Sequence, residues 1–168
     1  MAGRKSQAKG KAGEREACKL MQAILDKALE ESGTGKPGSR HVQRNTLQSD
    51  GGGCDLVGVP GVAIEVKRHA VLRVESWWKQ AVSQAERIGG SIPVLLYRQD
   101  RGKWQARVYA KLPIDCKEAL SMPVDLEMPD FTKWAVEYLK ARLIAEASIV
   151  PTFMIKEPKS ESFITDCV

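Results

Sequence analysis

The sequence predicts one α/β domain in which helices flank a mixed β-sheet. Two observations support this prediction: segments with the apolar spacing of helices alternate with short apolar strands, and the chain is long enough to bury one core. It has 168 residues, of which 43% are hydrophobic and 28% are charged, as in ordinary globular proteins. The apolar run at 92–97 is far shorter than the roughly 20 residues of a membrane-spanning helix, so no membrane association is expected.

The chain opens with a basic segment, residues 1–11, that we expect to be a flexible arm. A helix is predicted to follow over residues 12–31, because apolar side chains recur there every three or four positions, at Ala17, Leu20, Met21, Ile24 and Ala28. Gly33 and the glycines after it are expected to end this helix and begin a loop.

A β-hairpin is predicted after this loop. Residues 54–59 and 62–67 have the composition of strands, and the Pro60–Gly61 dipeptide between them is typical of a tight turn. Residues 40–48 are a weaker, polar strand candidate. A second helix is predicted over residues 74–88, with its core-facing side chains at Trp78, Ala81, Ala85 and Ile88.

Two more strands, residues 91–98 and 104–112, complete the predicted sheet. We expect a short helix at 115–121 and a longer amphipathic helix at 130–145, and the pattern beyond residue 149 supports no assignment. The predicted organisation is an arm over residues 1–11, a core over 12–111, and a helical extension and tail over 112–168 of the same domain.

The charge distribution points to a polyanionic partner. Residues 1–111 hold 20 Lys and Arg against 11 Asp and Glu, a net of +9, whereas residues 112–168 hold 6 against 10, a net of −4. A basic surface of this kind makes nucleic acid the first candidate. The four cysteines stand too far apart for a zinc knuckle, so we expect reduced thiols and a cytoplasmic protein.

Three residues of the predicted hairpin could support catalysis. Glu65 and Lys67 are two apart on one strand, so their side chains share a face, roughly 7 Å apart along the backbone. If the hairpin brings Asp55 to Glu65, the repulsion between the two carboxylates favours a divalent cation such as Mg²⁺ or Mn²⁺ between them. The alternative is that Glu65 and Lys67 are solvent-facing positions on an edge strand.

A third acidic residue, Glu14, lies near the apolar stripe of the first helix, whereas Glu16 lies well to the side. The carboxylate of Glu14 either joins the predicted site or is an ordinary acid in the first helical turn, where it interacts favourably with the helix dipole.

Three segments carry a resemblance to a known family. Asp55 follows a run of glycines, and Glu65 and Lys67 come ten and twelve positions later. This order resembles the metal-binding core of the PD-(D/E)XK nuclease superfamily, with Cys54 in place of the proline. Residues 11–16 and 89–95 are similar to the matching segments of archaeal Holliday junction resolvases and their phage-encoded relatives.

The resemblance implies a restriction-endonuclease-like nuclease core that binds Mg²⁺, for which Mn²⁺ could substitute. It implies as metal ligands the carboxylates of Asp55, Glu65 and Glu14 and the carbonyl of Val66. Phosphodiester hydrolysis needs a nucleophile at neutral pH and cations where negative charge develops, and a bound divalent ion supplies both.

The resemblance also implies roles for two residues that do not bind the metal. Lys67 would orient or help deprotonate the attacking water and offset charge on the phosphate. Gln80 matches a glutamine often found beside the site, although it is equally compatible with a solvent-facing position on its helix.

The implied function is a metal-dependent DNA endonuclease, in particular a Holliday junction resolvase that works in recombination as a homodimer, in the bacterial host cytoplasm if the protein is phage-encoded. Alternatives are a nuclease of the same fold acting on other branched or duplex DNA, and a non-catalytic DNA-binding module. The basic residues expected to contact DNA are Lys9, Lys11, Arg15, Arg44, Arg68, Arg73, Lys79, Arg98 and Arg101.

Overall fold

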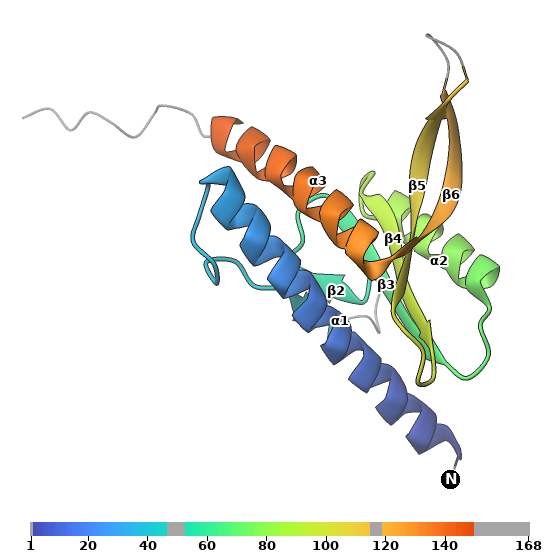
Figure 1. The fold of residues 1–168 in the computed structure, drawn as a ribbon. Helices are drawn as coiled ribbons and strands as arrows, with labels where there is room; N and C mark the ends of the chain where they lie inside the picture. Colours follow the sequence, from blue (N-terminus) through green and yellow to red (C-terminus); the bar gives the residue numbers. More distant parts are fainter. Residues whose placement is uncertain (1, 47–52, 115–118, 150–168) are drawn as a thin grey trace, which may run out of the picture.

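The computed structural model describes residues 2–46, 53–114 and 119–149. It has one mixed β-sheet with α2 on one face and α1 and α3 packed together on the other (Figure 1). The predicted α/β fold is therefore confirmed. The elements in chain order are α1 (Ala2–Ser32), β1 (Gln43–Arg44), β2 (Leu56–Val57), β3 (Val62–His69), α2 (Val74–Arg87), β4 (Ile92–Gln99), β5 (Gln105–Pro113), β6 (Ala119–Glu127) and α3 (Met128–Ile149).

The six strands lie in the sheet in their chain order, from β1 to β6. Neighbouring strands are antiparallel except β3 and β4, which are parallel and are connected through α2. The predicted hairpin is confirmed, since β2 and β3 pair with Leu56 opposite Ile64. A parallel pair needs a crossover connection, and α2 supplies it.

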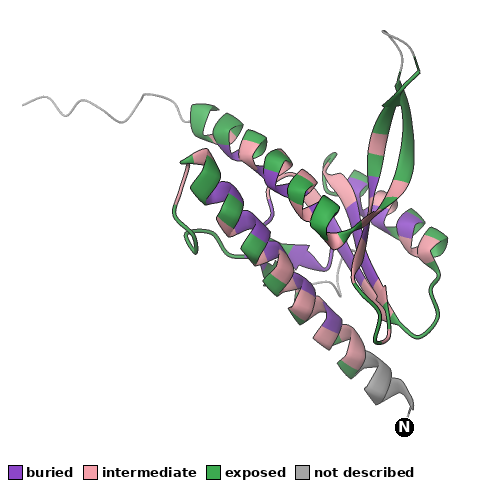
Figure 2. Ribbon diagram, in the orientation of Figure 1, coloured by how far each residue is buried: buried purple, intermediate pink, exposed green. Residues whose placement is uncertain are grey.

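Residues 63–66 of β3 are all buried (Figure 2), because side chains that alternate between the two faces of the sheet are covered on both. Ile64 and Val66 join the large core beneath α1 and α3. Ala63 packs on Ala85 of α2, and Glu65 is buried. The side chains of β3 that face α2 therefore include the predicted chemical residues, because side chains two apart on a strand share a face.

The turn between β2 and β3 depends on two glycines. Gly58 has φ +92°, and a Cβ there would come within 2.1 Å of the carbonyl oxygen of His41. Gly61 has φ +69°, and its carbonyl oxygen accepts hydrogen bonds from the Tyr138 hydroxyl at 3.2 Å and the Ile92 N–H at 2.9 Å. This turn therefore ties the hairpin to both β4 and α3.

Two sequence-based predictions differ from the structure. Residues 2–11, expected as a flexible arm, belong to α1, which their alanine, lysine and glutamine residues favour. The segment expected as a short helix at 115–121 is described from residue 119 and belongs to β6. Apolar residues alternate along this strand at Leu120, Met122 and Val124, and the cross-strand pairing with β5 uses that period of two.

In the part of the chain that the structure describes, no helix has the length and apolar character needed to cross a membrane. The residues predicted to lie beyond the last helix, from 150 onward, are outside the described residues, as are 47–52 and 115–118. The structure describes two of the four cysteines, Cys18 and Cys54, and these two do not form a disulfide with each other.

Candidate active site

The β2–β3 hairpin brings Asp55 and Glu65 together. The backbone N–H of Asp55 donates to the carbonyl of Ile64 at 2.9 Å, and its carboxylate oxygen Oδ2 accepts from the N–H of Val66 at 2.6 Å. Both acidic side chains are buried, with 8% of Asp55 and 1% of Glu65 exposed. The alternative of a solvent-facing Glu65 is therefore wrong.

The environment of Glu65 opposes its ionisation. Burial raises the pKa of Glu65 from 4.5 to about 7, and the negative charge of Asp55 adds to this rise. The ammonium group of Lys67, which forms an ion pair with Glu65 Oε1, acts in the opposite direction. The second oxygen, Oε2, is buried and has no hydrogen-bond partner in the part of the chain that the structure describes. A buried carboxylate oxygen without a donor is a place where a cation would be stabilised.

The glutamine beside this carboxylate is Gln84. It is 8% exposed and its amide lowers the pKa of Glu65, whereas Gln80 lies on the exposed side of the same helix. Gln84 follows Ala81 by three positions, so it lies at the edge of the stripe that faces the sheet. That position in the stripe is the sequence signal that could have identified it. Ile88, also expected in the stripe, is exposed because α2 ends at Arg87.

The donor set of the hairpin fits a small divalent cation. Asp55 and Glu65 are both buried, and Glu65 Oε2 lacks a donor among the described residues. Carboxylate oxygens are the ligands that Mg²⁺ and Mn²⁺ prefer. The carboxylate of Glu14, the third predicted acidic ligand, accepts a 2.6 Å hydrogen bond from Nε of Arg44. Among the described residues, no three acidic, histidine or cysteine side chains converge on one point.

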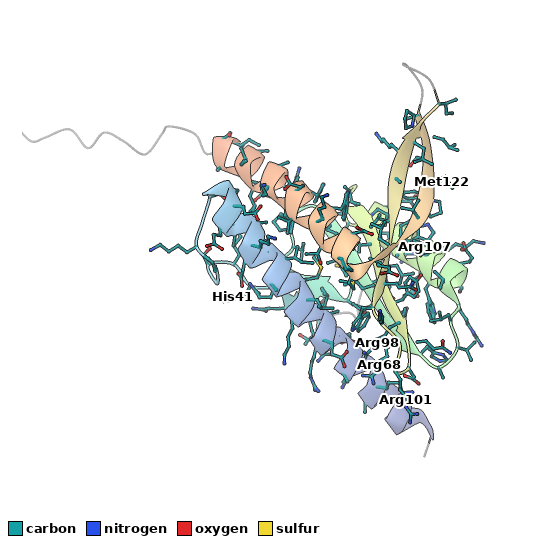
Figure 3. The ribbon with its side chains drawn as sticks, viewed as in Figure 1. His41, Arg68, Arg98, Arg101, Arg107 and Met122 are labelled. Carbon is teal, nitrogen blue, oxygen red and sulfur yellow. The ribbon has the colours of Figure 1, made fainter. Side chains whose placement is uncertain are left out.

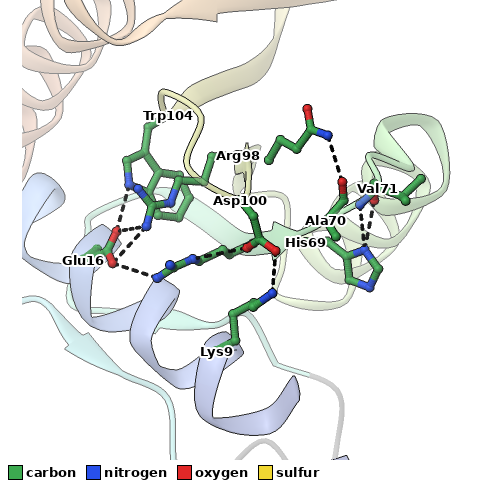
Figure 4. Close-up of polar contacts among 10 residues, drawn as sticks. Lys9, Glu16, His69, Ala70, Val71, Arg98, Asp100 and Trp104 are labelled. Carbon is green, nitrogen blue, oxygen red and sulfur yellow. Dashed lines mark hydrogen bonds and ion pairs between the residues drawn. The ribbon is translucent and has the colours of Figure 1, made fainter. Parts of the chain in front are cut away.

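Glu16, expected to lie to the side, is the centre of an ion-pair network between α1 and the ends of β3 and β4 (Figure 4). Its carboxylate accepts from Arg68 at 3.0 Å, Arg98 at 2.8 Å and the indole N–H of Trp104 at 3.3 Å. The guanidinium of Arg98 also lies 5.0 Å from the centre of the Trp104 ring. This network holds the N-terminal half of α1 against the sheet.

The nine basic residues expected to contact DNA divide into two groups. Four of them form ion pairs within the protein: Lys9 with Asp100, Arg44 with Glu14, and Arg68 and Arg98 with Glu16. The other five are exposed: Lys11, Arg15, Arg73, Lys79 and Arg101. Figure 3 shows Arg68, Arg98 and Arg101 at the same end of the molecule, beside the N-terminal half of α1.

A second charged cluster, which the sequence pattern did not predict, joins α2, β5 and β6. Arg107 pairs with Asp125 at 2.6 Å and with Glu75 on α2. The hydroxyl of Tyr97 donates to Asp125 at 2.9 Å, and burial raises the pKa of Tyr97 to about 12. Arg107, Asp125 and Tyr97 each have a partner, so this cluster ties α2 and β4 to the ribbon of β5 and β6.

A family model described as phage putative PDDEXK endonuclease matches residues 5–120 of the chain. The match covers α1 to the start of β6 and therefore includes Asp55, Glu65, Lys67 and Gln84. No curated protein matches the chain.

Proposed function

The chain belongs to the phage putative PDDEXK endonuclease family, and we propose that it is a Mg²⁺-dependent endonuclease that resolves four-way DNA junctions. The match over residues 5–120 of a 168-residue chain supports endonuclease activity for the fold as a whole. Beyond endonuclease activity, we propose that the metal is Mg²⁺, that the substrate is a branched DNA and that the protein acts as a homodimer.

One observation carries the proposed metal dependence: Glu65 Oε2 is buried, lacks a hydrogen-bond donor among the described residues, and belongs to a carboxylate beside Asp55. A purely structural carboxylate in this position would cost free energy unless a donor or a cation compensated it. The proposed ligands are Asp55, Glu65 and, by the family resemblance, the carbonyl of Val66. Glu14 contributes, in this proposal, through its contact with Arg44 and not as a ligand.

When bound, Mg²⁺ would lower the pKa of a water molecule and polarise the scissile phosphate. The side chains around it would have separate tasks. Lys67 is 26% exposed and reaches from Glu65 toward solvent, where its charge would offset the negative charge that develops on the phosphate. Asp55 is held by the Val66 N–H, which keeps its Oδ2 pointed at β3. Gln84 would orient Glu65 from the side of α2.

The proposed substrate follows from charge and symmetry. The exposed basic residues supply contacts to phosphates, which carry no direct sequence information. Selectivity for a branched substrate would therefore come from the geometry of two sites, one in each copy of a homodimer, that cut opposed strands. The competing functions are cleavage of other branched or linear DNA and DNA binding without turnover.

The decisive experiment compares cleavage of a four-way junction with cleavage of a linear duplex made from the same arms, in Mg²⁺, in Mn²⁺ and in EDTA. We expect paired incision of the junction in Mg²⁺ or Mn²⁺, and none in EDTA. Glu65→Gln should lower the rate by orders of magnitude while binding survives, and Glu86→Gln, an exposed carboxylate on α2, serves as the matched control.

Three outcomes would separate the alternatives. Equal cleavage of duplex and junction would leave a general endonuclease, and binding without cleavage would leave a DNA-binding module. Cleavage in EDTA, or near-normal rates for Glu65→Gln, would contradict the assigned metal site.

A further inference from the structure

The β-ribbon of β5 and β6 has one continuous apolar face. Cross-strand partners on this face are Ala106 with Leu126, Val108 with Val124, Ala110 with Met122, and Leu112 with Leu120. The first two pairs pack into the core beneath α1 and α3. The last two pairs lie further along the ribbon, which extends beyond the body of the protein (Figure 1).

Nothing in the described part of the chain covers the outer half of this face. Met122, Leu112, Leu120 and Ile114 are 38%, 45%, 53% and 66% exposed, and Figure 3 shows Met122 on the projecting part of the ribbon. We call residues 110–114 and 119–123 the ribbon tip. Four large apolar side chains on one projecting ribbon exceed the scattered exposure that is normal for monomeric proteins.

The opposite face of the ribbon is held to α2. Arg107 pairs with Asp125 and Glu75, and the ring of Tyr109 packs against Trp78 with 5.0 Å between the ring centres. The ribbon tip is therefore fixed at its base, and its apolar face is directed to the side of the sheet that carries α3.

An apolar cleft adjoins the base of the ribbon tip on that side. It has a volume of about 1020 Å³, at the upper limit for small-molecule sites, and it is open to solvent. Apolar side chains that line it come from both strands of the ribbon and from α3: Val108, Ala110, Val124, Leu126, Trp134 and Tyr138. Its lining and size suit apolar side chains of a polypeptide.

We propose that a second copy of this chain occupies the cleft, with each copy placing its ribbon tip against the cleft of the other. An exposed apolar ribbon tip and an open apolar cleft on the same chain are the two complementary halves that a two-fold interface requires. In such an arrangement the contact between ribbon tip and cleft is made twice. Both contacts contribute to the surface that each partner buries, which is roughly 800 Å² in a standard interface. This proposal does not depend on nuclease activity.

Two further features indicate that two copies associate through the apolar faces of their ribbons and not by backbone pairing between their edge strands. Pro123 in β6, the edge strand, lacks an N–H, so this edge is a poor template for an added strand. The polar residues of the cleft include two acids, Asp130 and Glu137, and two lysines, Lys111 and Lys133, so two copies related by a two-fold axis can place opposite charges together at its border.

The test is the oligomeric state of the full chain, measured by analytical ultracentrifugation with and without DNA. The wild-type protein should sediment as a dimer. The Leu120→Glu/Met122→Glu variant should weaken the dimer by about 100-fold, because each ribbon tip would then place two carboxylates against an apolar cleft. Ile144→Glu, at an exposed apolar position of α3 outside the cleft, should leave the dimer unchanged.

A second measurement locates the contact. A photo-crosslinking phenylalanine analogue at position 120 should form a covalent dimer, with the crosslink mapped to the cleft near Trp134 or Tyr138. Circular dichroism and thermal melting of each variant show whether it is folded. A monomer at all concentrations, a dimer that Leu120→Glu/Met122→Glu leaves intact, or a crosslink outside the cleft would overturn the proposal. These experiments measure association and not cleavage. If they overturned the proposed interface, single-strand nicking by the proposed nuclease would be unaffected.

Discussion

The carboxylate of Asp55 accepts a 2.6 Å hydrogen bond from the backbone N–H of Val66, which lies between Glu65 and Lys67 on β3. The same strand pairing that sets the register of β2 on β3 therefore fixes the position of Asp55 relative to Glu65. Because the donor of this bond is a backbone N–H, a side-chain substitution on α2 can alter the electrostatics around Glu65 and leave the bond between Asp55 and Val66 in place. That separation makes the contribution of α2 measurable.

The first prediction concerns Gln84. Replacing it with Met keeps approximately the volume but removes the amide beside Glu65, so we expect the cleavage rate to fall by about 10- to 100-fold, as for other residues that orient a metal ligand. Gln80→Met changes the same residue type on the exposed side of the same helix and should have no effect. Single-turnover cleavage rates at several Mg²⁺ concentrations measure the difference, since a positioning role also raises the Mg²⁺ requirement. Equal rates for the two variants would remove Gln84 from the site.

The second prediction concerns pH. In EDTA, the raised pKa of Glu65 means that the folded protein retains a proton between pH 4.5 and about 7 that the unfolded chain has released. The free energy of unfolding should therefore fall as the pH rises through this range, and Glu65→Gln should remove that fall, which is on the order of 3 kcal/mol.

Urea unfolding of both proteins at pH 5 and pH 8 in EDTA measures this effect. At pH 8, Mg²⁺ should stabilise the wild-type protein and have little effect on Glu65→Gln. Parallel pH profiles for the two proteins would show that Glu65 ionises normally in the folded state.

The spacing of residues was sufficient to predict the hairpin that carries Asp55 and Glu65, because alternation along 62–67 and a Pro-Gly turn are local signals. It was insufficient for Gln84, because Gln80 and Gln84 are one turn apart and differ by only about 40° around α2, so the pattern alone does not show which of them is buried beside Glu65. The helical wheel correctly separated Glu16 from the apolar stripe of α1. What it could not predict is that the ends of β3 and β4 place two arginines beside that position, since such contacts join residues distant in sequence.

The third prediction follows from that network. Glu16→Ala leaves the guanidinium groups of Arg68 and Arg98 without their shared acceptor, and it should lower the free energy of unfolding by about 1–2 kcal/mol, a modest value because Glu16 is partly exposed. Glu30→Ala removes an exposed carboxylate from the same helix and should change stability by less than about 0.5 kcal/mol. Urea unfolding followed by tryptophan fluorescence is suitable because Trp104 belongs to the network. An unchanged stability for Glu16→Ala would mean that solvent replaces these contacts.

The last prediction concerns the exposed face of α1. Lys11, Arg15 and Lys19 are spaced four residues apart, so they form one stripe of positive charge on the side of the helix that faces solvent. Unlike Arg68 and Arg98, whose charges are paired with Glu16, these cations are accessible to phosphates. Replacing all three with alanine should weaken DNA binding and reduce the slope of log affinity against log salt by about 0.9 for each phosphate that is no longer neutralised.

The control for this stripe is a second triple variant with the same change in net charge, at Lys36, Arg87 and Arg142, which are exposed and lie outside α1. Long-range attraction depends on net charge and should fall equally in both variants, whereas contact with phosphates depends on position. Binding titrations of a catalytically inactive Glu65→Gln background between about 50 and 200 mM NaCl would distinguish the two effects. If the slope falls equally in both triple variants, α1 contributes only to the general field of the protein, and the phosphate-binding residues must lie on another surface.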